Sequence, residues 1–386
     1  MIRVLSLLVL FSLPLAATMP AAAQSTARTF TGLNPLLDRA AGDPAMRPLK
    51  TVIVARGGRL LAERGFHGHS PSESTNIKSA SKSVISALVG IAIGKGLLAG
   101  PDQKIAPILK ADLPAAPDPR INDITIGHLL SMQAGLDRMS GPNYGRWVSS
   151  RNWVRFALSQ PFVDQPGGDM LYSTASTHLL SAILTRVSRR STLALAREWF
   201  GPVDGFRIGA WERDPQGIYL GGNQMAMSAR SLLAFGELYR NGGRTREGEQ
   251  VVPADWISQS WQHHTNSHFS GDEYGYGWFT RQIGGEQVHF AWGYGGQMLY
   301  IVPSLDLTVV MTSEESGPSA RNGYRDLLHT RWQISSARCG PPEKTVIVKF
   351  LAKPPIKPQN ACCMVRENFG KASCCWISGR SISLLP

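Results

Sequence analysis

The sequence predicts a mixed α/β fold of the α+β type, in which an antiparallel sheet is flanked by helices and carries an inserted all-helical subdomain. Three observations support this prediction. Residues 48–65 and the region after residue 275 contain short runs rich in β-branched and aromatic residues, as strands do. Residues 100–215 have mainly helical patterns, and residues 79–95 are apolar on nearly every side of a predicted helix. Strands at both ends with helices between them favour one sheet with a helical insertion.

The composition is that of a globular protein. The chain has 386 residues, of which 43% are hydrophobic and 18% charged, so a large core is expected and disorder through charge repulsion is not. The net charge of +12 is concentrated near the end, because residues 331–386 hold nine Lys and Arg against two Asp and Glu. The rest is mildly basic and has no basic stripe interleaved with aromatic residues, so we expect no nucleic-acid partner.

Residues 1–23 are predicted to be a cleaved secretory signal. Arg3 precedes an apolar run over residues 4–17, and Ala21, Ala22 and Ala23 then fit an A-x-A cleavage site. The alternative is a membrane anchor, but the run is shorter than the ~20 apolar residues that span a bilayer. We therefore expect a periplasmic or secreted protein with no stable membrane span.

The main domain is predicted to occupy residues 24–330. A strand hairpin over residues 48–65 turns at Gly57-Gly58, and the buried helix at 79–95 follows it. Residues 125–132 begin with a Thr that can cap a helix, and residues 226–240 are stopped by Asn-Gly-Gly. The other expected elements are helices at 152–158 and 176–188, strands at 276–279, 287–290, 298–302 and 307–312, and a terminal helix starting near 320.

Residues 331–386 form a tail of different character. They contain two Pro-Pro pairs and all five cysteines of the chain, and they lose helical periodicity. The cysteine spacing matches no common zinc pattern and no histidine accompanies it, so we expect no metal. The tail is predicted to lie outside the catalytic fold and is a candidate for disorder.

The strongest chemical motif is Ser79-Ala80-Ser81-Lys82 at the start of the apolar helix. Residues at positions i and i+3 share one helix face, so the lysine amine can reach the serine hydroxyl. Burial would lower the pKa of Lys82 and let it act as a base, and the helix N-terminus would favour a developing oxyanion. The alternative is a solvated surface lysine, which the apolar surroundings disfavour.

Two further motifs have a structural and a functional interpretation. Tyr172 follows a Pro-Gly-Gly loop and could serve the serine as a general base, either as a phenolate or by sharing the lysine proton, or it could be a core tyrosine. Trp292-Gly293-Tyr294 lies between two predicted strands, where glycine permits close approach and a backbone N–H could complete an oxyanion hole. The alternative is a tight glycine turn.

Together these motifs resemble the serine β-lactamase and penicillin-binding superfamily, especially its class C-like esterase and 6-aminohexanoate-dimer hydrolase branch. The resemblance covers roughly residues 30–330. Residues 79–82 match the S-x-x-K motif, residues 172–174 stand where the family has Y-x-N, and residues 291–293 stand where it has K-T-G or H-T-G. It implies a β-lactamase-like sheet with a helical insertion.

The resemblance also implies roles for individual residues. Ser79 would be the nucleophile, and Lys82 and Tyr172 would manage its proton and activate the deacylating water. The N–H groups of Ser79 and Tyr294 would bind the oxyanion. Thr174, Trp292 and Gly293 would contact the substrate. Trp211 and Asp214 are further candidates for the pocket lining, although they would serve equally well in the core.

Two departures from the family pattern bear on substrate choice. Thr174 replaces the Asn of the second motif, which shortens or removes a hydrogen bond to substrate. Ala291 replaces the cation of the third motif, which would attract a substrate carboxylate. The sequence therefore predicts a serine hydrolase of small-molecule esters, amides or short peptides, without a cofactor. The alternatives are a β-lactamase or D-alanyl-D-alanine carboxypeptidase, and a non-catalytic ligand-binding homologue.

Overall fold

The computed structural model describes residues 33–317, 322–338 and 344–350. Its centre is an eight-stranded sheet in which every paired neighbour is antiparallel. The predicted antiparallel sheet is therefore confirmed. In spatial order the strands are β2 (Arg59–Gly65), β1 (Leu49–Arg56), β11 (Leu307–Ser313), β10 (Gln297–Val302), β9 (Glu286–Gly293), β8 (Phe279–Ile283), β7 (Glu273–Tyr274) and β6 (Thr265–Asn266).

Strands from the early and the late part of the chain are neighbours in this sheet, because β1 pairs with β11. Successive side chains of a strand point to opposite faces, and the core is divided accordingly. On β10, Leu299 and Ile301 belong to one buried cluster, while Met298 and Tyr300 belong to the other. Both sheet faces are therefore covered, as the continuous apolar runs of β10 and β11 require.

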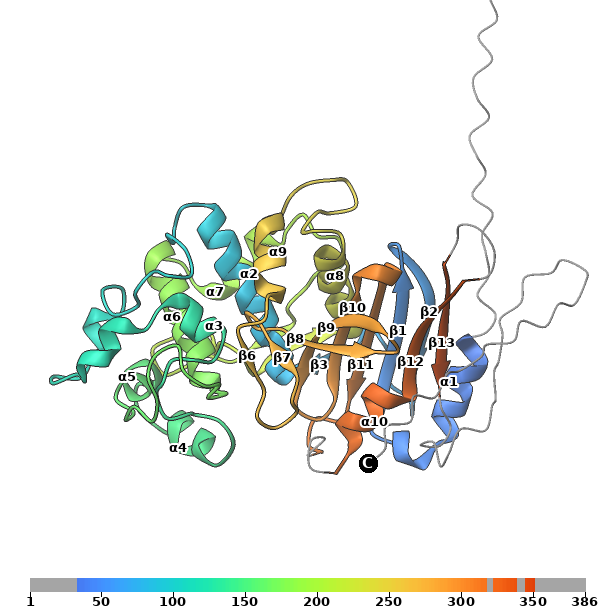
Figure 1. Cartoon of the computed structure of the whole chain (residues 1–386), viewed down its shortest axis with the longest axis horizontal. Helices are drawn as coiled ribbons and strands as arrows, with labels where there is room; N and C mark the ends of the chain where they lie inside the picture. Colours follow the sequence, from blue (N-terminus) through green and yellow to red (C-terminus); the bar gives the residue numbers. More distant parts are fainter. Residues whose placement is uncertain (1–32, 318–321, 339–343, 351–386) are drawn as a thin grey trace, which may run out of the picture.

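Helices cover the two faces of the sheet differently (Figure 1). The face towards the helical part carries α2 (Ser81–Gly94) and α8 (Ala229–Arg240), and α8 packs across β1, β10 and β11. Gly236 allows this close packing, since a Cβ there would lie 2.5 Å from Leu299. The opposite face carries α10 (Tyr324–Arg331), and α1 (Leu33–Gly42) lies against β2.

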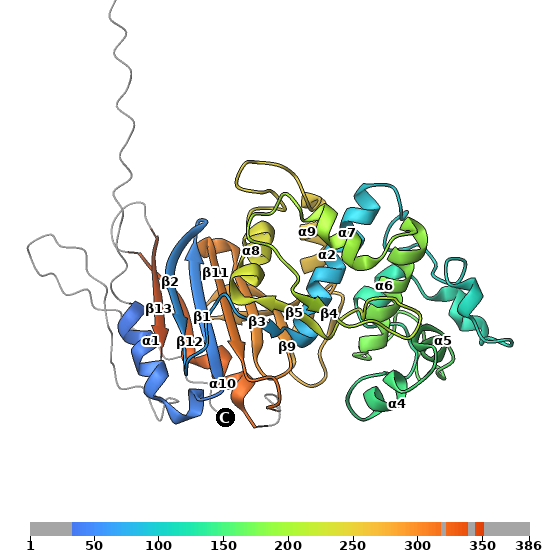
Figure 2. The same ribbon diagram turned by 180° about the vertical axis from the view of Figure 1, so that it is seen from behind.

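The helical part lies to one side of the sheet, with α2 between the two in both views (Figures 1 and 2). It falls within the stretch predicted as a helical insertion, residues 100–215. Thr125 caps the first of these helices by accepting a hydrogen bond from the His128 backbone N–H at 3.1 Å. The helices are α3 (Ile126–Leu130), α4 (Tyr144–Val148), α5 (Trp153–Leu158), α6 (Thr174–Ser188) and α7 (Thr192–Trp199), and α9 (Ala254–Trp261) follows later in the chain.

A three-stranded sheet was not expected from the sequence. It consists of β3 (Ser74–Asn76), β5 (Met225–Ser228) and β4 (Ala210–Trp211), with β5 in the centre. The helix predicted from residue 226 therefore begins at Ala229, because the residues before it pair with β3 and β4. These strands are only two to four residues long, too short for a period-two pattern to be visible.

The tail contains β12 (Trp332–Arg338) and β13 (Lys344–Phe350), which pair as a separate two-stranded sheet. The predicted secretory signal at residues 1–23 and the predicted atypical tail after residue 350 lie outside the described residues, so both remain predictions. None of the helices in the described ranges combines the length and apolar character that a membrane crossing needs.

Candidate active site

Ser79 lies where the eight-stranded sheet, the three-stranded sheet and the helical part meet. The chain leaves β3, makes a 3-10 turn over Lys78–Ala80 (η2), and enters α2 at Ser81. Lys78, directly before the serine, has a φ of 50°, a left-handed conformation that costs a non-glycine residue free energy. The turn leaves the side chain of Ser79 partly exposed, whereas most of α2 is buried. The hydroxyl of Ser79 is thus presented near the surface at the start of a buried helix.

Lys82 brings a desolvated amine to this hydroxyl. Its Nζ lies 3.0 Å from Oγ of Ser79, and the whole residue is only 2% exposed. Burial lowers the pKa of Lys82 from its ordinary 10.5 to about 7, because the charged form loses hydration. A substantial fraction of the amine is therefore neutral at physiological pH and can accept a proton.

Tyr172 completes the cluster. Its hydroxyl lies near the side chain of Ser79, which partly offsets the rise in pKa that burial causes, and its ring centroid lies 4.9 Å from Nζ of Lys82. The ring itself packs against Phe269 and Phe279 at centroid distances of 5.7 and 6.3 Å. Burial raises the pKa of Tyr172 well above that of a free phenol, so the group is a neutral phenol at pH 7. A standing phenolate, one of the two forms considered from the sequence, does not fit this environment.

The end of β9 approaches the serine turn from the sheet. A Cβ on Gly293 would lie 2.1 Å from the carbonyl oxygen of Ile77, so only glycine fits there. The close approach expected at this glycine is real, but its partner is the backbone two residues before Ser79. The end of β9 therefore lies against the turn that carries Ser79.

A model of the Beta-lactamase family matches residues 43–330. The chain belongs to the Beta-lactamase family. This match confirms the resemblance drawn from the motifs, and it ends where the sequence places the boundary between main domain and tail.

Relatives of known name agree with this membership. The 6-aminohexanoate-dimer hydrolase of Paenarthrobacter ureafaciens is 25% identical over 300 residues, which cover 70% of this chain and 74% of the relative. Among solved structures, EstCE1, a hydrolase with promiscuous acyltransferase activity, has a TM-score of 0.61 at 20% identity and covers 76% of this chain and 98% of its own. The octameric penicillin-binding protein homologue from Pyrococcus abyssi has a TM-score of 0.60 at 18% identity, covering 78% of each chain. The two structures show the shared fold.

Three residues proposed for substrate contact are buried in this Beta-lactamase-family chain. Thr174 is buried in the first turn of α6, and its Oγ1 lies 3.0 Å from Oγ of Ser140. Trp211 is 8% exposed and donates its Nε1–H to the carbonyl oxygen of Leu220. Asp214 has no exposed side-chain surface. Both Trp211 and Asp214 are held inside the protein, and their part in lining the pocket stays a prediction.

Trp292 and Tyr294 remain near the surface. The ring of Trp292 is partly buried against Phe269 and Phe279, and the guanidinium of Arg325 lies 5.0 Å from its centroid. The side chain of Tyr294 is 47% exposed in the turn between β9 and β10. Phe269, which is 44% exposed, and Trp292 form an aromatic rim beside Tyr172.

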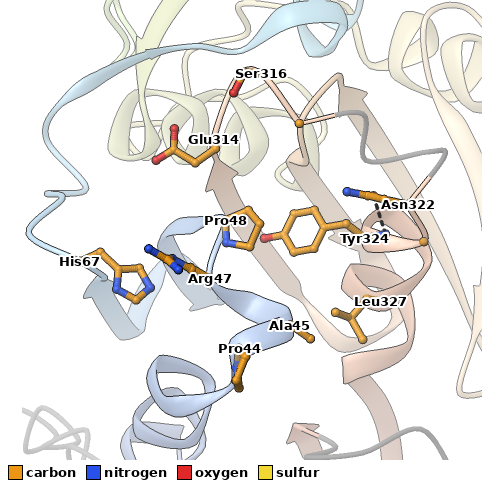
Figure 3. A pocket seen from close by; sticks show the side chains of 12 residues that line it. Pro44, Ala45, Arg47, Pro48, His67, Glu314, Ser316, Asn322, Tyr324 and Leu327 are labelled. Carbon is orange, nitrogen blue, oxygen red and sulfur yellow. Dashed lines mark hydrogen bonds between the residues drawn. The ribbon is translucent and has the colours of Figure 1, made fainter.

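A separate cavity of about 820 Å³ lies at one end of the sheet (Figure 3). Arg47, His67, Glu314 and Tyr324 point towards it, from the segment after α1, the loop after β2, the end of β11 and α10. None of the residues predicted for catalysis lines this cavity, and we assign it no part in the chemistry.

The sequence missed one member of the site, the carbonyl oxygen of Gly222. It accepts a hydrogen bond from Nζ of Lys82 at 2.7 Å. Side-chain motifs cannot identify a backbone acceptor, and the only available signal was the pair Gly221-Gly222 between Leu220 and Asn223. Among the described residues, no group of three or more His, Cys, Asp or Glu side chains could hold a metal ion.

Proposed function

We propose that this Beta-lactamase-family member is an exported serine hydrolase that cleaves esters or amides through an acyl-enzyme on Ser79. One observation carries the proposal: a lysine amine with a pKa of about 7 lies at hydrogen-bond distance from a partly exposed serine hydroxyl. An amine with that pKa is a competent general base at neutral pH.

Acylation begins with proton transfer from the hydroxyl of Ser79 to the neutral amine of Lys82. Oγ attacks the substrate carbonyl carbon at the same time, and the carbonyl oxygen becomes an oxyanion. In this scheme the N–H groups of Ser79 and Tyr294 receive this charge, and the contact of Gly293 with Ile77, which brings the end of β9 to the serine turn, supports the assignment.

Tyr172 serves as a proton relay in this scheme. Its phenol is neutral, so it donates its proton to the leaving alkoxide or amine and is resupplied by the ammonium of Lys82. Deacylation uses the same groups in reverse, with water entering where the leaving group departs. Both the nearness of the Tyr172 hydroxyl to Ser79 and the position of Nζ near the tyrosine ring support this route.

The proposed substrates are small esters or amides that lack a carboxylate next to the scissile bond. Ala291 is 1% exposed and packs in the same core cluster as α2, so this position offers no cation to a substrate. The aromatic rim of Phe269 and Trp292 favours an apolar acyl or leaving group. The names of the 6-aminohexanoate-dimer hydrolase and EstCE1 relatives support amide and ester bonds.

Covalent labelling tests the proposal. A fluorophosphonate probe should modify the purified wild type at Ser79, located by mass mapping, and Ser79→Ala should abolish the label. Ser81→Ala is the matched control, because it removes a hydroxyl two residues away that binds the carbonyl oxygen of Lys78. Absence of label on the wild type would favour a non-catalytic ligand-binding homologue.

A substrate panel separates the remaining hydrolase classes. Short-chain nitrophenyl esters and small amides should be cleaved faster than cephalosporins or D-alanyl-D-alanine peptides. The opposite ranking would assign the chain to β-lactamase or carboxypeptidase chemistry. Export is tested separately by sequencing the N-terminus of the periplasmic or secreted protein, which should begin at or near Gln24.

A further inference from the structure

The position of the Lys82 amine depends on the turn at Gly221-Gly222. The carbonyl oxygen of Gly222 accepts a hydrogen bond from Nζ at 2.7 Å. Gly222 has a φ of 81°, and a Cβ there would come within 2.9 Å of Cγ of Lys82. A displacement of this turn would therefore move the amine or remove its acceptor.

Behind the turn lies a fully buried pair, His178 on α6 and Asp214 in the loop after β4. Neither side chain has exposed surface, and Nε2 of His178 lies 3.1 Å from Oδ2 of Asp214. The other oxygen of Asp214 accepts the backbone N–H groups of Gln216 and Ile218, at 2.9 and 2.8 Å. The carboxylate is thus held by three donors, as burial of a charge requires.

The second ring nitrogen of His178 contacts the turn itself. The backbone N–H of Gly221 donates to Nδ1 at 3.4 Å, so Nδ1 is the unprotonated nitrogen. The ring proton is therefore on Nε2 and is donated to Asp214. Protonation of Nδ1, or a change of tautomer, would set two donors against each other at Gly221.

The imidazole has little freedom to change this arrangement. Trp147 and Trp153 pack edge-on against it, each with a centroid distance of 5.6 Å. Gly221 is pressed against α6, since a Cβ there would lie 2.2 Å from the carbonyl oxygen of Thr177. Hydrogen bonds therefore run without interruption from Asp214 through His178 to the turn that binds Lys82.

We propose that His178, oriented by Asp214, is a positioning residue for the general base. This inference rests on the proposed function. A neutral amine has two hydrogens and one lone pair. When the turn accepts one hydrogen at Gly222, the lone pair is free to accept the proton of Ser79. If the turn were loosened, the protein would stay folded and the amine would stay buried, but the amine would be wrongly oriented. Acylation would then be slower although the nucleophile is still present.

Two substitutions at His178 separate positioning from stability. In His178→Asn the amide oxygen can take the place of Nδ1 and accept from Gly221, but the contact with Asp214 is lost. In His178→Gln the amide takes the place of Nε2 and keeps the contact with Asp214, but the acceptor for Gly221 is lost. Each variant removes one polar contact from the same buried site, so the two variants should lose similar amounts of folding stability.

The readouts are the rate of fluorophosphonate labelling at Ser79 and the free energy of unfolding of each variant. We expect His178→Gln to label at least roughly tenfold more slowly than His178→Asn, although the two unfold at similar denaturant concentrations. Equal labelling rates, or rates that follow stability alone, would overturn the inference.

Asp214→Asn provides an independent test if either histidine variant fails to fold. Its amide can still accept from Gln216 and Ile218, but its NH₂ group would face Nε2 of His178 and force the ring proton onto Nδ1, against Gly221. We expect labelling to slow roughly tenfold here too. A wild type that is not labelled at Ser79 refutes the proposed function and this inference together. If the wild type is labelled and Asp214→Asn is labelled equally fast, the inference about His178 is refuted but the proposed function is not.

Discussion

The amine of Lys82 lies 3.0 Å from the hydroxyl oxygen of Ser79 and is almost completely shielded from water. This relationship links the chemistry to pH. Because burial lowers the pKa of Lys82 to about 7, the fraction of neutral amine rises through neutral pH. In the proposed mechanism, Ser79 transfers its proton only to that neutral form of Lys82.

The rate of Ser79 acylation should therefore increase with pH, with a midpoint near 7, and level off above about pH 8. Single-turnover labelling between pH 5 and 9 measures this directly. Tyr172→Phe should be slower at every pH but retain the midpoint, since the phenol stays neutral across this range. A flat profile, or a midpoint near 10, would contradict a buried general base.

The same pKa shift predicts how stability depends on pH. Between pH 7 and 10.5 the unfolded chain binds the lysine proton and the folded chain does not, so stability rises as pH increases through that window. Below pH 7 the buried amine is charged in the folded chain, and a pKa shift of this size then lowers the free energy of unfolding by up to about 5 kcal/mol.

Lys82→Met removes the titrating group, so its stability advantage over the wild type should be largest below pH 7 and shrink towards pH 10.5. Denaturant unfolding at pH 6 and pH 10 measures the difference. Lys104→Met is the control, because its amine is half exposed beside Asp123. A Lys82→Met advantage that does not change with pH would mean that the amine stays charged in the folded protein.

Tyr172→Phe should separate the hydroxyl from the ring. The ring packing against Phe269 and Phe279 is retained, so we expect a change in the free energy of unfolding of less than about 1 kcal/mol. Loss of the hydroxyl that contacts Ser79 should lower kcat/KM by roughly 10²-fold or more. Activity within threefold of the wild type would remove Tyr172 from the proton relay.

Gly293→Ala should disrupt the approach of β9 to the serine turn. The added methyl would lie 2.1 Å from the backbone oxygen of Ile77, where neither strand nor turn can yield without moving. We expect a loss of about 2–4 kcal/mol in stability and a roughly 10²-fold fall in labelling rate.

Gly42→Ala at the end of α1 is the matched control, because its Cβ would meet nothing within 4 Å. It should behave as wild type in both unfolding and labelling. If Gly293→Ala labels as fast as Gly42→Ala, the backbone N–H of Tyr294 contributes little to the oxyanion hole.

Much of the fold could be predicted because its signals are local. The hairpin of β1 and β2, the cap at Thr125, and the hairpin joining β10 to β11 each depend on residues close together in the sequence. The three-stranded sheet could not be predicted, because its strands are very short and come from distant parts of the chain. Such pairing depends on tertiary context rather than on intrinsic preference.

The sequence by itself determined that Ser79 and Lys82 lie together, since helical spacing places residues three apart on one face whatever surrounds them. It also determined that the helix is buried, through its unbroken apolar composition. The tertiary structure decided what those residues can do. Desolvation, the carbonyl oxygen of Gly222 and the Asp214–His178 pair come from segments up to 140 residues away in the sequence. Their effect on the amine of Lys82 depends on distances in space, which a linear pattern of residue types does not contain.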